Sequence, residues 1–172
     1  MAGQQMQALV TESSAGGSPK MVKKQVPVPE PAPHQALVKV SHIAQNPTDV
    51  QSLDGNAFGD GAVLGCDFVG TVEAVGDRCS KLSKGDIVAG LIWGGEIKGL
   101  GGYSEYTLAD DHISFRVPKN ISPEEAATIP LASMTAELAL FSKECLAIPR
   151  ESGPETAVLI WGGSCKLLQD TR

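Results

Sequence analysis

The sequence has few aromatic residues and no long apolar run. Phe, Trp and Tyr together make up 5% of the 172 residues. No apolar run approaches the ~18 residues of a transmembrane helix, and residues 1–7 have neither the charged nor the apolar part of a secretory signal. These absences predict a cytoplasmic protein without a membrane partner.

Positive charge is also scarce, and it is scattered. Fourteen Lys and Arg residues stand against twenty Asp and Glu residues, which leaves a net charge of −6. A nucleic-acid site needs clustered Lys and Arg to offset phosphate charge. Nucleic acid is therefore not expected as a partner.

The residues that most often bind metals are few and show no ligand spacing. The cysteines are Cys66, Cys79, Cys145 and Cys165, without a C-x-x-C pair. The histidines are His34, His42 and His112. Because neither set has the spacing of a zinc or redox motif, we expect reduced thiols and no bound metal.

Glycine and proline, by contrast, are abundant. The chain has nineteen Gly and eleven Pro, above the usual ~7% and ~5%. Up to residue 120 they separate short segments of strand character, a pattern typical of a sandwich or barrel. The expected strands cover 7–10, 21–26, 36–44, 67–75, 87–93, 103–109 and 113–117. We predict a mainly β fold with some α, built on a small, partly open barrel.

The pattern changes after Asn120. Ser122-Pro123-Glu124-Glu125 combines a capping Ser, Pro at the first helical position and Glu three residues after the Ser. A short helix is expected from there to residue 129, where Pro130 interrupts it. Residues 132–145, rich in Ala, Leu and Met at helical spacing, predict a second helix.

The last segment looks like the start of a nucleotide-binding unit. Residues 156–161 form a continuous apolar run of the kind that parallel sheets bury on both faces. Gly162 and Gly163 follow, where glycines let backbone amides approach a pyrophosphate. Eleven residues follow Trp161, whereas one βαβ unit takes about 30 or more. We expect the first strand of an incomplete Rossmann domain, and a bare glycine turn is the alternative.

Five motifs occur in order along the chain. They are Asn46-Pro47-Thr48-Asp49, residues 64–72, Lys84-Gly85-Asp86-Ile87-Val88, residues 101–106, and residues 125–130 followed by Thr135-Ala136. Together they resemble the medium-chain dehydrogenase/reductase superfamily, whose members join a GroES-like barrel to a Rossmann domain. Within it, residues 112–143 resemble the fungal trans-acting enoyl reductases, which are partners of polyketide synthases.

The resemblance implies three parts. Residues 1–120 would be the GroES-like, substrate-side barrel, 121–155 a helical bridge, and 156–172 the start of the cofactor domain. Zinc alcohol dehydrogenases share the barrel, but they have a Cys where this chain has Asn46 and a His-Glu pair where it has Cys66-Asp67. A catalytic zinc needs three protein ligands, and this chain has one thiol at the matching positions. We expect a zinc-free reductase in which Cys66 is a small core residue.

The resemblance also implies the site. NADPH would be the cofactor, held by Asn46, Thr48, Asp49, Val50, Gln51, Thr135, Gly162 and Gly163. The acyl substrate would be lined by Ala136, Glu137, Leu138, Ala139, Leu140, Phe141, Ser142 and Lys143. A local Asx-type turn is the alternative for the first group, and ordinary helix core for the leucines of the second. Tyr103 and Tyr106 are expected to pack in the barrel, and no proton donor is assigned.

The implied function is reduction of the α,β-double bond of a polyketide intermediate in secondary metabolism. The intermediate would be bound to the acyl carrier domain of a polyketide synthase. An incomplete cofactor domain predicts little activity for the chain alone. Two alternatives stay open: a catalytically empty fragment or binding module, and a zinc-free quinone or alkenal reductase. An exposed apolar strand at 156–161 would promote self-association.

Overall fold

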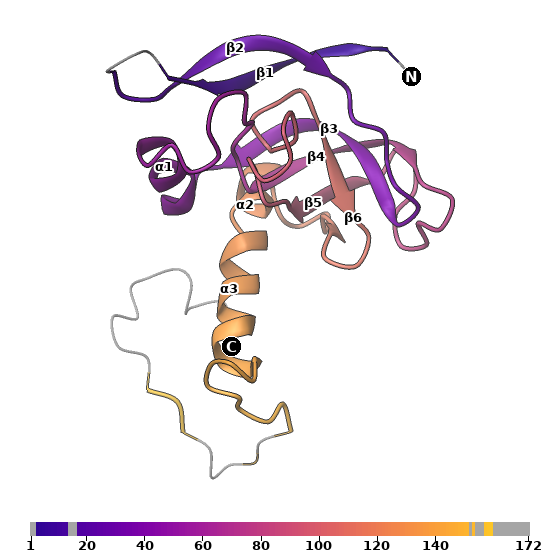
Figure 1. Ribbon diagram of the computed structural model, residues 1–172. Coiled ribbons are helices and arrows are strands. Elements are labelled where there is room, and N and C mark those ends of the chain that lie inside the picture. Colours follow the sequence, from indigo (N-terminus) through magenta and orange to yellow (C-terminus); the bar gives the residue numbers. More distant parts are fainter. Residues whose placement is uncertain (1–2, 14–16, 152, 154–156, 160–172) are drawn as a thin grey trace. The chain divides into compact units, whose positions relative to one another are not determined.

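The computed structural model describes residues 3–13, 17–151, 153 and 157–159, and it divides the chain into two compact units, 1–128 and 129–172. Figure 1 labels the elements. In chain order they are β1 (Gln5–Glu12), β2 (Lys20–Pro27), β3 (Gln35–Ala44), α1 (Pro47–Asp54), β4 (Asp67–Val75), β5 (Ile87–Leu91), β6 (Tyr106–Asp110), β7 (Phe115–Arg116), α2 (Pro123–Ala127) and α3 (Pro130–Phe141). The prediction of a mainly β fold with few helices is confirmed.

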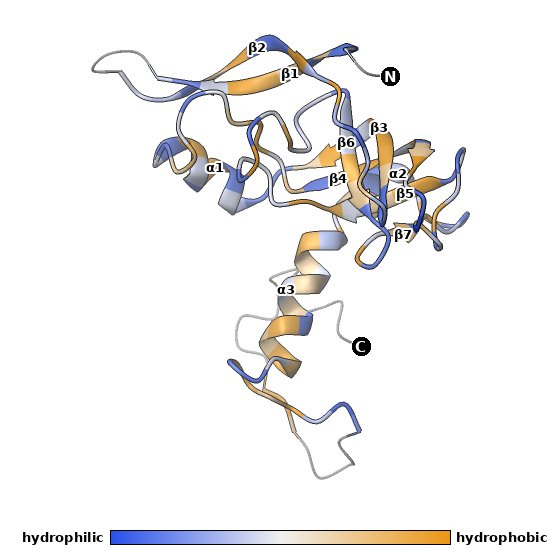
Figure 2. Ribbon diagram, turned by 45° about the vertical axis from the view of Figure 1, so that its right-hand side comes forward, coloured by the Kyte–Doolittle hydropathy of each residue, from blue (hydrophilic) through white to orange (hydrophobic). Residues whose placement is uncertain are grey.

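The first unit contains two antiparallel sheets. β1 and β2 form a hairpin, and the second sheet has the strand order β6-β3-β4-β5-β7. Figures 1 and 2 show the hairpin as a layer apart from the larger sheet. Isolated backbone bridges join Ala8 to Ser104 and Val10 to Val63. These bridges link the hairpin to the rest of the unit, which gives the partly open barrel.

The central strand β4 is buried on both faces. Phe68 and Val72 pack in the main core cluster with Val38 of β3, whereas Val69 packs against the alanines of α2. Apolar colour accordingly runs along much of β3 and β4 in Figure 2. The helix α2 thus belongs to the first unit, which extends to Thr128. The borders expected at residues 120 and 155 stay predictions.

Gly70 allows the two central strands to approach each other. A Cβ at this position would lie 2.2 Å from the carbonyl oxygen of Lys39 and 2.6 Å from a methyl group of Val38. The pairing of β3 with β4 also shifts register between Val40 and His42. Glycine inside this strand therefore marks a close approach of two backbones.

Three strands are shorter than the sequence predicts. β6 begins at Tyr106 and not at Tyr103, because residues 103–104 bond to β1 instead: the Leu9 N–H donates to the Tyr103 carbonyl at 2.9 Å. β5 ends at Leu91, and β7 has two residues. Local pattern could not show which strand each segment would choose as its partner.

Of the helices, α2 begins as predicted and α1 was missed. The Ser122 N–H donates to Oε2 of Glu125 at 3.0 Å, and the Glu125 N–H donates back to Oγ of Ser122 at 3.3 Å, which is the predicted capping box. α2 ends at Ala127, two residues earlier than expected. The sequence predicted only a turn at residues 46–51, because the α1 segment is short and mostly polar.

The second unit contains α3. Pro130, predicted to interrupt a helix, occupies the first turn of this one, where its missing N–H costs nothing. The helix ends at Phe141 with Ser142 as its C-cap, earlier than the predicted residue 145. The Arg150 guanidinium donates to the Glu137 carboxylate and lies 4.5 Å from the ring centroid of Phe141.

Part of the predicted strand at 156–161 falls within the described residues. Residues 157–159 are exposed and have no strand structure. A strand forms only where a neighbouring backbone supplies hydrogen bonds, and no described residue supplies them here. Residues 156, 160 and 161 and the glycine pair Gly162 and Gly163 lie outside the described residues. No helix in the described part of the chain is long and apolar enough to span a membrane.

Candidate functional site

The first predicted site residues form the start of α1. Asn46 precedes the helix in an extended conformation, and Pro47 opens it. The Asn46 N–H donates to Oδ2 of Asp49 at 2.8 Å, so the acid three residues on satisfies a free amide, as in a capping box. Asp49 is 4% exposed. Its carboxylate is therefore a fixed part of the fold.

The Asn46 side chain ties this helix to the central sheet. Its amide Nδ2 donates to Oδ2 of Asp67 at 2.9 Å, and Asp67 opens β4 with 1% of its surface exposed. The amide is thus engaged by Asp67. We name the group Asn46, Asp49, Cys66, Asp67 and Tyr103 the α1–β4 cluster.

Burial controls protonation in the α1–β4 cluster. It raises the pKa of the Cys66 thiol to about 12, with a further contribution from the charge of Asp49. Burial likewise raises the pKa of Tyr103 well above its usual range, and the charge of Asp49 again adds to the effect. At neutral pH the thiol and the phenol are therefore both protonated.

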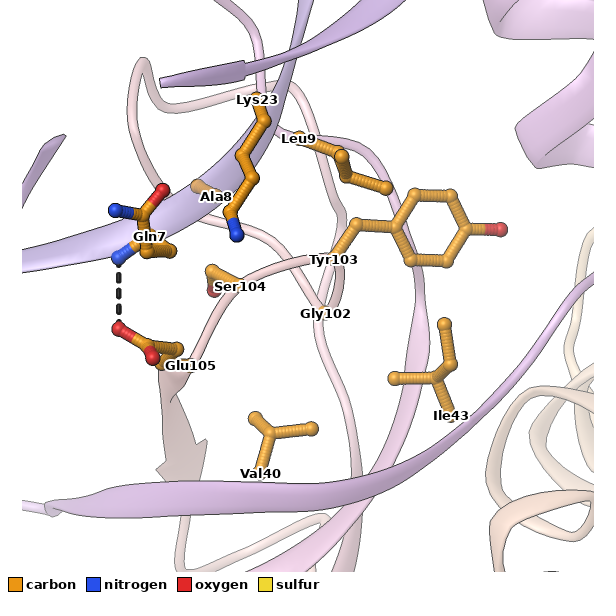
Figure 3. Close-up of a pocket in the computed structure, with 10 residues that line it drawn as sticks. All are labelled: Gln7, Ala8, Leu9, Lys23, Val40, Ile43, Gly102, Tyr103, Ser104 and Glu105. Carbon is orange, nitrogen blue, oxygen red and sulfur yellow. Dashed lines mark hydrogen bonds between the residues drawn. The ribbon is translucent and has the colours of Figure 1, made fainter. Parts of the chain in front are cut away.

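Tyr103 also lines a pocket, which is drawn in Figure 3. Its volume is about 400 Å³, within the usual range for small-molecule sites. Figure 3 shows the Tyr103 ring extending between Leu9 and Ile43. The lining residues are Gln7, Ala8, Leu9, Lys23, Val40, Ile43, Gly102, Tyr103, Ser104 and Glu105.

The pocket combines an apolar wall with a small polar edge. Leu9, Val40 and Ile43 supply the apolar wall, and the Gln7 N–H donates to Oε2 of Glu105 at 2.7 Å on the polar edge. The sequence did not predict this pocket. The motif at 101–106 marked the segment, but the partners from β1 and β3 come from tertiary pairing. Such a wall suits the apolar part of a ligand.

The other three cofactor residues predicted in this segment are more accessible to solvent than Asp49. Thr48 is half-buried, and Val50 and Gln51 are exposed. A neutral hydroxyl and a neutral amide can bond a carboxamide or a ribose without adding charge. The start of α1 therefore has two kinds of residue: Asn46 and Asp49 hold the turn, while the other three leave polar and apolar groups accessible.

The predicted residues on α3 belong to the second unit. The Thr135 hydroxyl donates to the Leu131 carbonyl at 2.7 Å within its own helix. Glu137 is engaged by Arg150. At 3.6 residues per turn, residues 136–141 point to every side of the helix, from buried Ala136 to Leu138, which is 53% exposed, and residues 142–143 follow its end. Only some of these eight residues can face one ligand.

Asn46, Cys66 and Asp67 occupy the positions that were compared above with the zinc ligands of zinc alcohol dehydrogenases. Zn²⁺ in proteins is bound by Cys, His and Asp or Glu side chains, whereas the Asn46 amide is bonded to Asp67. The Cys66 thiol and the Asp67 carboxylate remain, fewer than the three protein ligands of a catalytic zinc. These groups do not fit a catalytic zinc, and the expectation of a zinc-free reductase stays a prediction.

Comparisons with known proteins agree on the family. The family model for the alcohol dehydrogenase GroES-like domain matches residues 32–119. The chain is 36% identical over 162 residues to trans-enoyl reductase grgB of a Penicillium species, an alignment that covers 92% of this chain and 45% of that protein. The chain thus spans less than half the length of this relative.

Solved structures show the same fold. An alcohol dehydrogenase superfamily protein from Novosphingobium aromaticivorans matches with a TM-score of 0.67 and 32% identity, over 80% of this chain and 42% of that one. The quinone oxidoreductase from Coxiella burnetii matches with a TM-score of 0.64 and 27% identity, over 82% of this chain and 46% of that one.

Proposed function

Because the chain belongs to the alcohol dehydrogenase GroES-like domain family, within the medium-chain dehydrogenase/reductase oxidoreductases, we propose that it is the substrate-side part of an NADPH-dependent enoyl reductase. The substrate would be a polyketide intermediate on an acyl carrier domain. The observation that carries this proposal is the 36% identity to a trans-enoyl reductase over 92% of the chain.

The residues present fit the nicotinamide end of the cofactor. When bound, NADPH supplies the hydride that adds to the β-carbon of an enoyl thioester. Thr48 and Gln51 offer the carboxamide and ribose neutral hydrogen-bonding groups. Asn46 and Asp49 keep the first turn of α1 in place through the 2.8 Å bond between them. Their role is to position the accessible residues, because a site works only when its groups are held in place.

The pocket fits the acyl part of the substrate. Leu9, Val40 and Ile43 form its apolar wall, which can bind an acyl chain and exclude water from it. Tyr103 joins this wall to the α1–β4 cluster. The Tyr103 hydroxyl is protonated at neutral pH and can donate a hydrogen bond.

A polypeptide limited to these 172 residues should bind NADPH weakly and reduce little substrate. The cofactor's pyrophosphate needs a glycine turn followed by a helix, and nine residues follow Gly163 here. Fluorescence titration with NADPH tests this directly. Tight, saturable binding would contradict it.

A chimera tests the activity itself. Residues 1–159 are joined to the cofactor domain of the Penicillium relative, and NADPH oxidation is followed with crotonyl-pantetheine and with a quinone. We expect oxidation with the enoyl thioester. Oxidation with the quinone alone would instead favour the quinone reductase alternative, which the likeness to the Coxiella burnetii protein supports. A folded chimera that binds NADPH but reduces neither compound would indicate a binding module.

Two variants of that chimera test the role of α1. Thr48→Ala and Gln51→Ala should each raise the KM for NADPH several-fold. Gln45→Ala, at an exposed position just before the helix, is the matched control and should leave KM unchanged. Equal KM values for all three variants would exclude the cofactor role proposed for α1.

A further inference from the structure

Two histidines far apart in the sequence meet beside a buried carboxylate. His34 precedes β3 and His112 follows β6, and their ring centroids are 5.3 Å apart. Asp111, which is 1% exposed, places Oδ1 3.4 Å from Nε2 of His112 and 3.9 Å from Nδ1 of His34. We name these three residues the His–Asp–His cluster.

Strand register creates this cluster. Gln35 of β3 pairs with Asp110 of β6. One residue beyond that pair, the Asp111 N–H donates to the His34 carbonyl at 3.0 Å. The His112 N–H donates to Oδ1 of Asp110 at 2.9 Å and fixes the following turn. The backbone therefore holds the three side chains at one end of the β3–β6 ladder.

The two carboxylate oxygens of Asp111 differ. Oδ2 accepts a hydrogen bond from the Ser80 N–H at 2.9 Å. Oδ1 is buried and has no hydrogen-bond partner among the described residues. The two imidazoles approach this oxygen at 3.4 and 3.9 Å without a hydrogen bond to it, and a buried carboxylate oxygen is unfavourable unless a cation or a donor compensates it.

We infer that the His–Asp–His cluster binds a divalent transition-metal ion, and that Zn²⁺ suits its donor set. Two imidazoles and one carboxylate are established zinc ligands, and tetrahedral Zn²⁺ bonds of ~2.0–2.2 Å hold ligand atoms about 3.4 Å apart. In the cluster the three ligand atoms lie within 4.8 Å of one another. Small rotations of the His34 and His112 side chains can bring these atoms to the separation found around zinc, because the two side chains are 47% and 61% exposed.

The donor atoms of the His–Asp–His cluster favour Zn²⁺ over Mg²⁺ and Ca²⁺. Mg²⁺ and Ca²⁺ prefer oxygen ligands and find one carboxylate here. Three protein ligands leave a fourth zinc position for water. The site is distinct from the α1–β4 cluster, and it connects the segment before β3 to the turn after β6. Since such a site exists only in the folded chain, Zn²⁺ should stabilise the first unit.

Metal titration tests the site with variants that preserve the fold. Chelator-treated protein is titrated with Zn²⁺ by calorimetry, and its thermal denaturation is followed with and without Zn²⁺. We expect one Zn²⁺ per chain and a higher Tm. Replacing a residue that only hydrogen-bonds to a metal ligand already lowers metal affinity about 10–100-fold. Loss of a ligand itself, in His34→Asn or His112→Asn, should therefore lower the affinity for Zn²⁺ at least about 100-fold.

Two further variants separate binding from folding. Asp111→Asn keeps an oxygen to accept from Ser80 but removes the charge, so it should fold in chelator yet show no rise in Tm with Zn²⁺. His42→Asn is the matched control, because His42 also lies near a carboxylate, with Nε2 3.4 Å from Oε1 of Glu124. It should bind Zn²⁺ as the parent chain does.

Cobalt identifies the ligand atoms. Co²⁺ at the His–Asp–His cluster should give visible bands without sulfur-to-metal charge transfer, and Zn²⁺ should displace it. The inference is overturned if His34→Asn and the parent chain bind Zn²⁺ equally. It is also overturned if Co²⁺ shows thiolate ligands alone, or if the parent chain binds no Zn²⁺ at micromolar concentration.

Discussion

The two units of the chain use polar side chains in different ways. In the first, the carboxylates of Asp49, Asp67 and Asp111 are buried and are bonded by backbone or side-chain donors. In the second, the Glu137–Arg150 pair is largely solvent-exposed. Groups held in a low-dielectric interior have fixed positions, whereas exposed pairs are screened by water. The contrast favours the first unit as the part whose groups are preorganised for binding.

The cysteines provide the sharpest test of this contrast. Cys66 of the first unit is buried with a thiol pKa of about 12, and Cys145 of the second unit is exposed. At pH 8 the thiolate fraction of Cys66 is on the order of 10⁻⁴. In a Cys165→Ser background, peptide mapping after iodoacetamide treatment should show Cys145 labelled and Cys66 protected by about 10³-fold. Equal labelling in the native state would contradict the contrast.

Glycine substitutions compare the packing of the units. Gly70→Ala places a Cβ 2.2 Å from the Lys39 carbonyl, whereas a Cβ at Gly153 meets nothing within 4 Å. Overpacking costs roughly 1–3 kcal/mol, and more where the backbone cannot move. Gly70→Ala should lower the free energy of unfolding by about 3 kcal/mol in denaturant titrations, while Gly153→Ala should leave it unchanged. Similar losses for both would show that the two positions are equally packed.

Removing the acid that caps α1 should have an intermediate effect. Asp49→Ala leaves the Asn46 N–H without its acceptor in a site where Asp49 is 4% exposed. Such a loss costs about 1–3 kcal/mol. Asp54→Ala, at the exposed end of the same helix, is the control. Urea titrations that rank Asp54→Ala as the more damaging change would refute the structural role of Asp49.

The Glu137–Arg150 pair should matter least. Arg150→Ala removes an exposed contact of the second unit. Because exposed ion pairs contribute little, the urea midpoint of the first unit should stay within error of the parent value. A clear shift in that midpoint would mean that Arg150 supports the first unit.

The predicted self-association is a separate small test. Val158 and Leu159 are 50% and 85% exposed. If this segment mediates contact between copies, Leu159→Lys should shift the chain toward monomer in size-exclusion chromatography. An unchanged profile of associated protein would place the contact elsewhere.

Local patterns explain which parts of the fold could be predicted. Alternating apolar residues located β3 and β4, and Ser122 with Glu125 located the start of α2, because these signals act over a few residues. The same type of box at Asn46 and Asp49 was present in the sequence, but only a turn was predicted there. The site was predicted in part: the start of α1 was singled out, whereas the pocket lined by Tyr103 depends on strands from distant segments.

The sequence by itself determined the family, the β-rich first unit and the start of α2. Tertiary structure decided which side chains meet. The spacing of His34 and His112 predicted no metal site, yet the pairing of Gln35 with Asp110 brings them together at Asp111. Asn46 likewise reaches Asp67 only because α1 begins beside β4. Register and packing between distant segments are collective properties of the fold, so no local pattern contains them.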